Sequence, residues 1–350
     1  MVQANSARRP VRIGIAGLNH DHVFELLRRP DMGDVVVAGI AEPDRGLAER
    51  YSRAGGFSMD QVYPNLEMMV DAVRPEAVMA YGPIFQHRHV VEVCAPRGIH
   101  VMVEKPLAVS MDHARGMAQL AREHGIHLLT NYETSWYAST YAAYQKVVNE
   151  GQVGDIRKVV VHDGHFGPVE IGCTPDFLAW LTDPVQNGGG AITDFGCYGA
   201  NLITWLMGGQ PPLSVTALAQ TLKPQIYPKV DDDATILLAY PRAQGIIQAS
   251  WNWPVSRKDL EIYGQHGQLL APDGLTLRLR LGDRVPEETI LLERNAPPLS
   301  DAFAYLAAVV RGTVKVQPGD LASLENNLIV VAILDAARTA ARTGVTQPWH

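Results

Sequence analysis

The chain has 350 residues, of which 47% are hydrophobic and 19% charged, and its formal net charge at pH 7 is −7. These values are ordinary for a globular protein, and the length allows two domains with a large buried core. The sequence contains no dense basic run and no apolar run of about 18 residues, which argues against nucleic acid as a partner and against a membrane span.

Apolar strands and helices alternate over the first 130 or so residues. Strands are expected at residues 11–16, 35–41, 77–81, 101–103 and 126–130, and helices at residues 21–29, 45–54, 66–73, 86–94 and 110–124. Asn65 and Ser110 stand where two of these helices need an N-cap. The alternation predicts an α/β domain of the Rossmann type, a doubly wound parallel sheet, over residues 1–130.

The regular alternation of predicted strands and helices ends at residue 131. A helix is expected at residues 140–150, followed by strands at 158–165, 214–221, 234–240, 245–251, 260–263, 275–281 and 289–292 and by helices at 196–207, 301–311 and 321–342. Neighbouring strands joined by short turns favour a mainly antiparallel or mixed sheet. Residues 131–350 are therefore predicted to form an α+β substrate domain with a large open sheet, and its last helix is expected to pack back on the first domain.

The first predicted strand runs into a turn that contains Gly17, Leu18, Asn19, His20 and His22. A dinucleotide fingerprint needs small residues at three fixed positions, which here hold Gly17, Asn19 and His22. Asparagine tolerates a left-handed backbone, whereas histidine leaves less room for a pyrophosphate. Because the turn follows a strand and opens a helix, these five residues are predicted to bind a cofactor. Alternate histidines at a helix start seldom converge on one ion, so no metal is expected.

Glu42 follows the second predicted strand, about 25 positions after Gly17, close to the offset of the acidic residue that holds an adenosine ribose. A carboxylate accepts hydrogen bonds from ribose hydroxyls and repels a 2′-phosphate, which favours NAD over NADP. Arg45 lies near enough to leave NADP open. The alternative for Glu42 is an exposed acidic residue in a turn.

The strand at 101–103 ends in Glu104, Lys105 and Pro106, at the sheet edge where ligands of α/β proteins bind. Pro106 restricts Lys105 to an extended backbone. A lysine beside a glutamate can exchange a proton once burial lowers its pKa. The alternative is a solvated ion pair at a strand end.

A glycine-rich turn at residues 188–190 leads into a helix that carries Asp194, Tyr198 and Asn201. Asp194 and Tyr198 are four residues apart, so they share a helical face, and Asn201 lies three further along it. The alternative for Tyr198 is a core aromatic residue with a satisfied hydroxyl.

These three motifs, in this order, resemble the glucose–fructose oxidoreductase, inositol dehydrogenase and rhizopine-catabolism (Gfo/Idh/MocA) family over residues 11–344. Where many members have Asp, His and Asp, this chain has Asp194, Tyr198 and Asn201, a pattern similar to the branch with glucose–fructose oxidoreductase, dihydrodiol dehydrogenase and xylose dehydrogenase. The resemblance implies that Lys105 shuttles a proton with help from Asp194 and Tyr198. It also implies cofactor contacts, which are Pro83, His87, Glu104 and Lys105.

Several residues are weaker candidates for contacts with a sugar. Trp136 and His165 are the preferred ones, together with Lys105, Asp194, Tyr198 and Asn201; Tyr137, Trp180, Trp251 and Trp253 could also stack on a sugar face. His162 and His165, three apart on a strand, point to opposite faces, so at most one lies in the cleft. The run at residues 231–233, three aspartates, is expected to be solvated, because adjacent carboxylates repel when buried.

The favoured function is an NAD(P)-dependent dehydrogenase or reductase acting on a carbohydrate hydroxyl or carbonyl group. The alternatives are a redox-neutral enzyme with captive NAD, such as an epimerase or a glycoside-cleaving enzyme, and a non-catalytic sugar sensor. Cys94, Cys173 and Cys197 form no paired framework, and the N-terminal region lacks a secretory signal pattern, so a cytoplasmic protein is expected. The resemblance further implies a homodimer or homotetramer that assembles through the C-terminal sheet.

Overall fold

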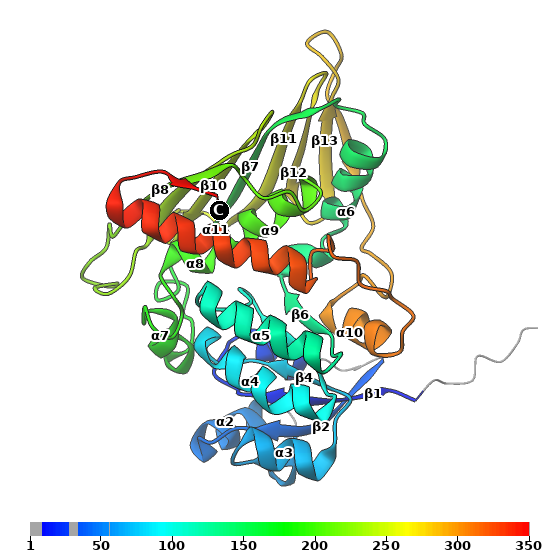
Figure 1. Cartoon of the computed structure of the whole chain (residues 1–350), viewed down its shortest axis with the longest axis vertical. Helices are drawn as coiled ribbons and strands as arrows, with labels where there is room; N and C mark the ends of the chain where they lie inside the picture. The colour runs from blue at the N-terminus through cyan, green and yellow to red at the C-terminus, as the bar shows by residue number, and fades with distance from the viewer. Residues whose placement is uncertain (1–8, 28–33, 56, 350) are drawn as a thin grey trace, which may run out of the picture.

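The computed structural model describes residues 9–27, 34–55 and 57–349, which form two sheets with helices packed around them (Figure 1). The first sheet has six strands, which are β1 (Val11–Ala16), β2 (Val35–Ala41), β3 (Val62–Tyr63), β4 (Ala77–Ala80), β5 (His100–Glu104) and β6 (Leu128–Asn131). Their order is β3-β2-β1-β4-β5-β6, and all neighbours pair in parallel. This is the strand order of dinucleotide-binding domains, as predicted.

Two of the helices of the first unit begin at the capping residues that the sequence predicts. The helices of this unit are α1 (Val23–Leu27), α2 (Arg45–Gly55), α3 (Leu66–Val73), α4 (His87–Cys94) and α5 (Met111–Glu123). Asn65 accepts a hydrogen bond from the backbone N–H of Met68, and Ser110 accepts one from that of His113. Both predicted N-caps are confirmed, because each satisfies a backbone donor that the first helical turn leaves free. Residues 28 and 29, the predicted end of the first helix, lie outside the described residues.

The second sheet has nine strands. They are β7 (Ile156–Gly164), β8 (Ser214–Gln220), β9 (Asp233–Ala239), β10 (Gln244–Ser250), β11 (Arg257–Gly264), β12 (Gln268–Asp273), β13 (Thr276–Arg280), β14 (Glu288–Leu291) and β15 (Gln347–Pro348). β7 pairs in parallel with β10, whereas the other neighbouring pairs are antiparallel, so the sheet is mixed and mainly antiparallel. The predicted fold class is confirmed.

Helices cover one face of the second sheet (Figure 1). They include α6 (Ala138–Tyr144), α8 (Ala191–Asp194) and α9 (Gly196–Leu206). Every residue of α9 is buried, which fits a helix placed between a sheet and further helices. The helix expected over 140–150 is α6 followed by a π-helical turn at Gln145–Asn149.

The last two long helices tie the sheets together. α10 (Ala302–Val310) packs on the first sheet, where Leu306 shares a core with Ile13 and Ile15. α11 (Leu324–Thr343) packs against β8 and α9 and also against α5. Its Asp335 accepts a hydrogen bond of 2.8 Å from the backbone N–H of Met111. The end of the chain therefore holds the first unit against the second. No helix within the described ranges is long and apolar enough to cross a membrane.

The expectation that the three aspartates at 231–233 are solvated is wrong. Asp231 accepts from the backbone N–H groups of Gly190 and Ile192 at 2.9 and 2.7 Å. Asp232 is fully buried and accepts two backbone N–H groups at 2.7 Å each, and Asp233 accepts from Ser250. Each carboxylate accepts from a different segment of the chain, so the hydrogen bonds offset the cost of taking the three groups out of water.

The contact with Asp231 explains the glycine-rich turn. A Cβ at Gly190 would lie 1.8 Å from the carbonyl oxygen of Asp231, which leaves no room for a side chain. The turn is therefore pressed against the strand entry, and this close approach places α8 with Asp194 at the junction of the two sheets.

Candidate functional site

A cavity of about 630 Å³ lies at the carboxyl ends of β1, β2 and β4. Gly17, Asn19, Glu42, Gly82 and His87 are among the residues that line it. Its volume is in the range of cofactor sites, and its place at the end of parallel strands is where such sites occur.

The lining residues fit a dinucleotide. Gly17 has φ +84°, and a Cβ there would lie 3.0 Å from the backbone nitrogen of Gly82, so only glycine allows this close backbone approach. Within the described residues, Asn19 Oδ1 and His87 Nε2 are buried without a hydrogen-bond partner, and both side chains line the cavity. Burying such atoms unpaired is costly, so a polar ligand would satisfy them.

His87 is held as a neutral imidazole. Its Nδ1 lies 3.1 Å from the carbonyl oxygen of Leu107, and burial lowers its pKa to about 4. Pro83, the other residue predicted at this turn, is buried and precedes a 3₁₀ turn at Ile84–Gln86. His87 thus faces the cavity as predicted, whereas Pro83 shapes the backbone that leads to it.

Glu42 supports the first turn. Its carboxylate accepts the backbone N–H groups of Leu18 and Asp44, both at 2.9 Å, and only 6% of the residue is exposed. Burial raises its pKa, although these two hydrogen bonds oppose the shift. A carboxylate has about four acceptor positions, so capacity remains for ribose hydroxyls on the cavity side. Leu18 contributes only its backbone, because its side chain is buried.

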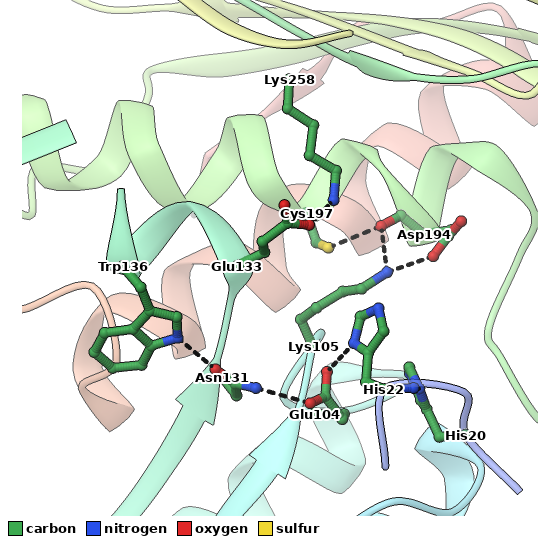
Figure 2. Close-up of polar contacts among 10 residues, drawn as sticks. All are labelled: His20, His22, Glu104, Lys105, Asn131, Glu133, Trp136, Asp194, Cys197 and Lys258. Atoms are coloured by element: carbon green, nitrogen blue, oxygen red, sulfur yellow. Dashed lines mark hydrogen bonds and ion pairs between the residues drawn. The ribbon is translucent and has the colours of Figure 1, made fainter. Parts of the chain in front are cut away.

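Lys105 and Asp194 form a buried ion pair beyond the end of β5 (Figure 2). The ammonium group donates to the Asp194 carboxylate and, at 3.0 Å, to the Asp194 carbonyl oxygen. Trp251 Nε1 donates to the other carboxylate oxygen at 2.9 Å. Burial lowers the pKa of Lys105, but the charge and hydrogen bond of Asp194, together with Cys197 and Asp163, outweigh this, so the pKa is raised. The expectation that burial leaves Lys105 with a lowered pKa is therefore wrong.

Tyr198 is buried beside two lysines. Its ring centroid lies 5.1 Å from the ammonium nitrogen of Lys105 and 4.7 Å from that of Lys258. Burial, followed by the charge of Asp163, raises the pKa of Tyr198 well above its usual value, so the side chain remains a phenol at neutral pH. Lys258 also forms an ion pair with Glu133 (Figure 2).

The sequence reasoning did not single out Lys258 or Asp163, although a signal for both exists. Lys258 is two and four residues before Leu260 and Ile262, so it lies on the same face of its strand as these core residues. Asp163 likewise shares the face of Val159 and Val161. A charge at an apolar-face position marks a buried polar group that needs a partner.

Among the candidate substrate residues, Asn201 and His162 have partners elsewhere, whereas His165 lies near Asp194 and Lys105. Asn201 is fully buried and donates to the carbonyl oxygen of Leu321 at 2.8 Å, so it anchors the segment before α11. His165 lies with its ring 4.9 Å from that of Phe195, and burial lowers its pKa to about 4. His162 instead pairs with Asp259, in agreement with the prediction that the two histidines point to opposite faces.

His22 and Glu104 are joined at the floor of this site (Figure 2). His22 Nδ1 lies 3.0 Å from Glu104 Oε2, and Asn131 Nδ2 donates to Glu104 Oε1 at 2.8 Å. Trp136 Nε1 donates to Asn131 at 2.8 Å. Trp136 thus lies at the end of this line of hydrogen bonds that is farther from Lys105 (Figure 2). The ring nitrogens of His20 and His22 and the Glu104 carboxylate lie within 4.8 Å of one another, so these side chains converge despite the expectation from their spacing.

A segment of the second unit covers the first turn. It contains α7 (Pro175–Leu181), which the sequence reasoning missed. Trp180 Nε1 donates to the carbonyl oxygen of Asn19 at 2.9 Å, and Asp21 accepts the backbone N–H of Thr174 at 2.9 Å. The His20 ring lies 4.6 Å from that of Phe177. Trp180 therefore holds the turn in place, and Trp251 holds Asp194.

Comparisons with known proteins cover most of the chain. Residues 11–132 match the family model described as an oxidoreductase family with an NAD-binding Rossmann fold, and residues 141–270 match that of the GFO/IDH/MocA C-terminal domain. Trans-1,2-dihydrobenzene-1,2-diol dehydrogenase of Macaca fuscata fuscata is 26% identical over 66% of this chain and 64% of that enzyme, less than two thirds of its length. The Xenopus tropicalis enzyme of the same name is 24% identical over 95% of this chain and 96% of its own.

Solved structures show the same fold. Aldose-aldose oxidoreductase from Caulobacter crescentus, complexed with glycerol, has a TM-score of 0.81 at 21% identity and covers 97% of this chain and 100% of its own. An inositol dehydrogenase homolog from Azotobacter vinelandii, complexed with NAD+, has a TM-score of 0.83 at 17% identity and covers 99% of each chain.

Proposed function

This chain belongs to the Gfo/Idh/MocA family of NAD-binding oxidoreductases, and from that premise we propose that it oxidises or reduces a carbohydrate hydroxyl or carbonyl group. The observation that carries the proposal is the buried pair of Lys105 and Asp194 at the end of β5, next to a cavity that fits a dinucleotide. Sugars, polyols and cyclic diols are the favoured substrates, since the relatives are named for dihydrodiols, aldoses and inositol.

The cofactor, when bound, supplies the hydride chemistry. The backbone around Gly17 would let it approach the sheet, Glu42 would hold the ribose, and Asn19 and His87 would offer it their unpaired polar atoms. These residues would bind and orient the dinucleotide, and they take no part in moving the proton of the substrate hydroxyl.

Lys105 binds the substrate oxygen through its ammonium group. Asp194 keeps that group charged and in place, and Trp251 in turn fixes Asp194. Tyr198 supplies a neutral phenol beside the same ammonium group. A positive charge at this position stabilises the developing oxyanion when the hydroxyl is oxidised, and favours attack on the carbonyl in the reverse direction.

A substrate panel tests the proposal. Purified protein is incubated with NAD and, one at a time, with aldoses, polyols, inositols and cyclic diols, and NADH fluorescence is followed. At least one class should give turnover that depends on Lys105. A panel without turnover, on protein that binds NAD, would favour the sugar sensor.

The segment around α7 favours one second candidate, a redox-neutral enzyme with captive NAD. Trp180 and Thr174 form hydrogen bonds with the turn at residues 19–21, so this segment fixes a turn that lines the cofactor cavity, and a fixed turn would slow the release of a bound dinucleotide. Captive NAD would let the protein oxidise and re-reduce one substrate, as an epimerase or a glycoside-cleaving enzyme does. Nucleotide that stays with the protein through gel filtration, together with sugar conversion without added NAD, would support this candidate.

Glu42→Ser should weaken NAD binding and raise the relative affinity for NADP. The change removes the repulsion of a 2′-phosphate, and it also removes the acceptor of the Leu18 N–H group, so a loss of about 1 kcal/mol in stability is expected. Nucleotide titrations of both variants measure the ratio of dissociation constants, with Glu49→Ser on the exposed side of α2 as control. A wild-type protein that already prefers NADP would show the ribose assignment to be wrong.

Tyr198→Phe should lower kcat at least tenfold, because a neutral hydrogen-bond donor beside the Lys105 ammonium group is lost from the proposed substrate site. Little change in stability is expected, since phenylalanine keeps the buried ring and its contacts with the ammonium groups of Lys105 and Lys258. Because the pKa of Tyr198 in the wild-type protein is raised well above 10, its hydroxyl does not titrate near neutral pH. The pH dependence of kcat near neutrality should therefore be the same in the variant. Tyr240→Phe, which removes another buried hydroxyl, is the control. Normal turnover with a lower melting temperature would instead indicate a structural role.

A further inference from the structure

Four side chains form a continuous line of hydrogen bonds that ends at His22 (Figure 2). Trp136 donates to Asn131, Asn131 donates to Glu104 Oε1, and His22 Nδ1 meets Glu104 Oε2, at 2.8, 2.8 and 3.0 Å. Glu104 is 2% and Asn131 8% exposed. Both oxygens of the carboxylate are therefore engaged, and one of them is held against His22.

The charge of Glu104 decides which nitrogen of His22 can titrate. Burial raises the pKa of Glu104, but His22 and Asn131 outweigh this and lower it, so the group is an ionised carboxylate that only accepts hydrogen bonds. His22 Nδ1 must then carry a proton and donate it to Glu104. The second nitrogen, Nε2, is left to take up or release a proton, which is the arrangement of a base oriented by a carboxylate.

The neighbouring imidazole of His20 is arranged differently. Its Nδ1 accepts the backbone N–H of His22 at 3.2 Å, and burial lowers its pKa well below the usual value. His20 is therefore a neutral side chain with its proton on Nε2. Of the two adjacent histidines, His22 alone has a carboxylate partner among the described contacts.

His22 is also accessible to solvent and lies near the ammonium group of Lys105, where the substrate hydroxyl is proposed to bind. Its side chain is 32% exposed, whereas that of Lys105 is 6% exposed. Figure 2 shows the free edge of the His22 ring turned toward the ammonium group of Lys105. That ammonium group donates to Asp194 twice and stays protonated at neutral pH, so it cannot accept the proton of a substrate hydroxyl.

We propose that His22, oriented by Glu104, accepts the proton of the substrate hydroxyl during oxidation and returns it during reduction, while Lys105 remains an ammonium group that holds the substrate oxygen. The inference rests on the proposed function. On oxidation the carbinol C–H and O–H bonds break and a C=O bond forms. The hydride leaves with both electrons to the nicotinamide dinucleotide, and the proton bonds to His22 Nε2 to give an imidazolium ion.

The charged groups around His22 set the direction of its pH dependence. They are Glu104 and Lys105 at the end of β5, Glu25 on α1, His20 in the same turn, and Glu133, whose own pKa is lowered in part by His22. Burial lowers the pKa of His22, but Glu104, with a smaller contribution from Glu25, outweighs burial and Lys105, so the pKa is raised. Oxidation needs the neutral imidazole, so its rate should rise with pH through this pKa, and the rate of reduction should fall.

Proton NMR of the protein without added cofactor or substrate tests the dyad directly. The Cε1 proton of His22 is assigned by its disappearance in His22→Gln. Its titration midpoint should lie above the usual value of about 6.5 and should fall in Glu104→Gln, because the carboxylate charge is lost. A midpoint at or below about 6.5, or one unchanged in Glu104→Gln, would overturn the proposal.

Kinetics test the role. His22→Gln should lower kcat for oxidation by about ten- to a hundredfold and remove the rising limb near neutrality, with NAD affinity nearly unchanged. His124→Gln, at an exposed histidine at the end of α5, should leave both turnover and limb as they are. A limb that persists in His22→Gln, or one that disappears on chelation with EDTA, would contradict the proposal. If no substrate is turned over, the proposed function fails, whereas the NMR titration still decides on the dyad.

Discussion

Lys105→Ala should lower kcat at least a hundredfold while NAD binding stays nearly intact. The ammonium group is the cation that we propose binds the substrate oxygen, and one well-oriented donor of this kind contributes about 10²–10³ in rate. Lys105 does not line the cofactor cavity, so the affinity of the protein for NAD should change little. Single-turnover assays with the best substrate of the panel and nucleotide titration on the same preparation measure the two effects separately.

Two controls make the Lys105→Ala result interpretable. Lys315→Ala removes an exposed lysine from the loop before α11 and should leave turnover unchanged. Circular dichroism measures the folded fraction, because the variant leaves Asp194 buried without its ion-pair partner. A folded Lys105→Ala protein with more than a tenth of wild-type turnover would exclude Lys105 from the chemistry.

Asp194→Ala should destabilise the protein by about 3–5 kcal/mol, the usual result of removing one partner from a buried ion pair. The substitution leaves the Lys105 ammonium group and Trp251 Nε1 without their acceptor. Urea denaturation measures the loss. Turnover of the folded fraction should also fall, because Lys105 would lose its orientation.

A double variant separates charge burial from catalysis. Lys105→Met with Asp194→Leu replaces both ions by apolar groups and should regain most of the lost stability while remaining inactive. Recovery of activity in this double variant, or a single Asp194→Ala variant of normal stability, would contradict the assignment of the pair.

The same pair gives stability a defined pH window. The pKa of Asp194 is lowered, since Lys105 outweighs the effect of burial, so its contribution is present above the ordinary carboxyl pKa of about 3.9 and is lost as the pH falls through the folded value. The pKa of Lys105 is raised, so its contribution is present below about 10.4 and is lost as the pH rises through the folded value.

Local patterns in the sequence were sufficient for most of the framework. The strands at residues 11–16 and 35–41 and the helix at 66–73 have the predicted bounds, because long apolar runs and a capping Asn65 carry strong local signals. The two-residue strands β3 and β15 and the short helix α7 were missed. Such elements are held by neighbours far away in the chain, so their own residues carry no periodicity to read.

The sequence alone determined the family, the cofactor turn and the three-residue motif at Lys105, because these are contiguous stretches with fixed spacing. The tertiary structure decided which side chains meet. It brings Asp194, 89 positions away in sequence, to Lys105 and so raises the pKa of Lys105. It places Lys258 beside Tyr198. It also pairs His22, which stands at a position that usually holds a small residue, with Glu104. Charge interactions depend on distance and burial, and neither can be read from residue order until the two sheets are packed together.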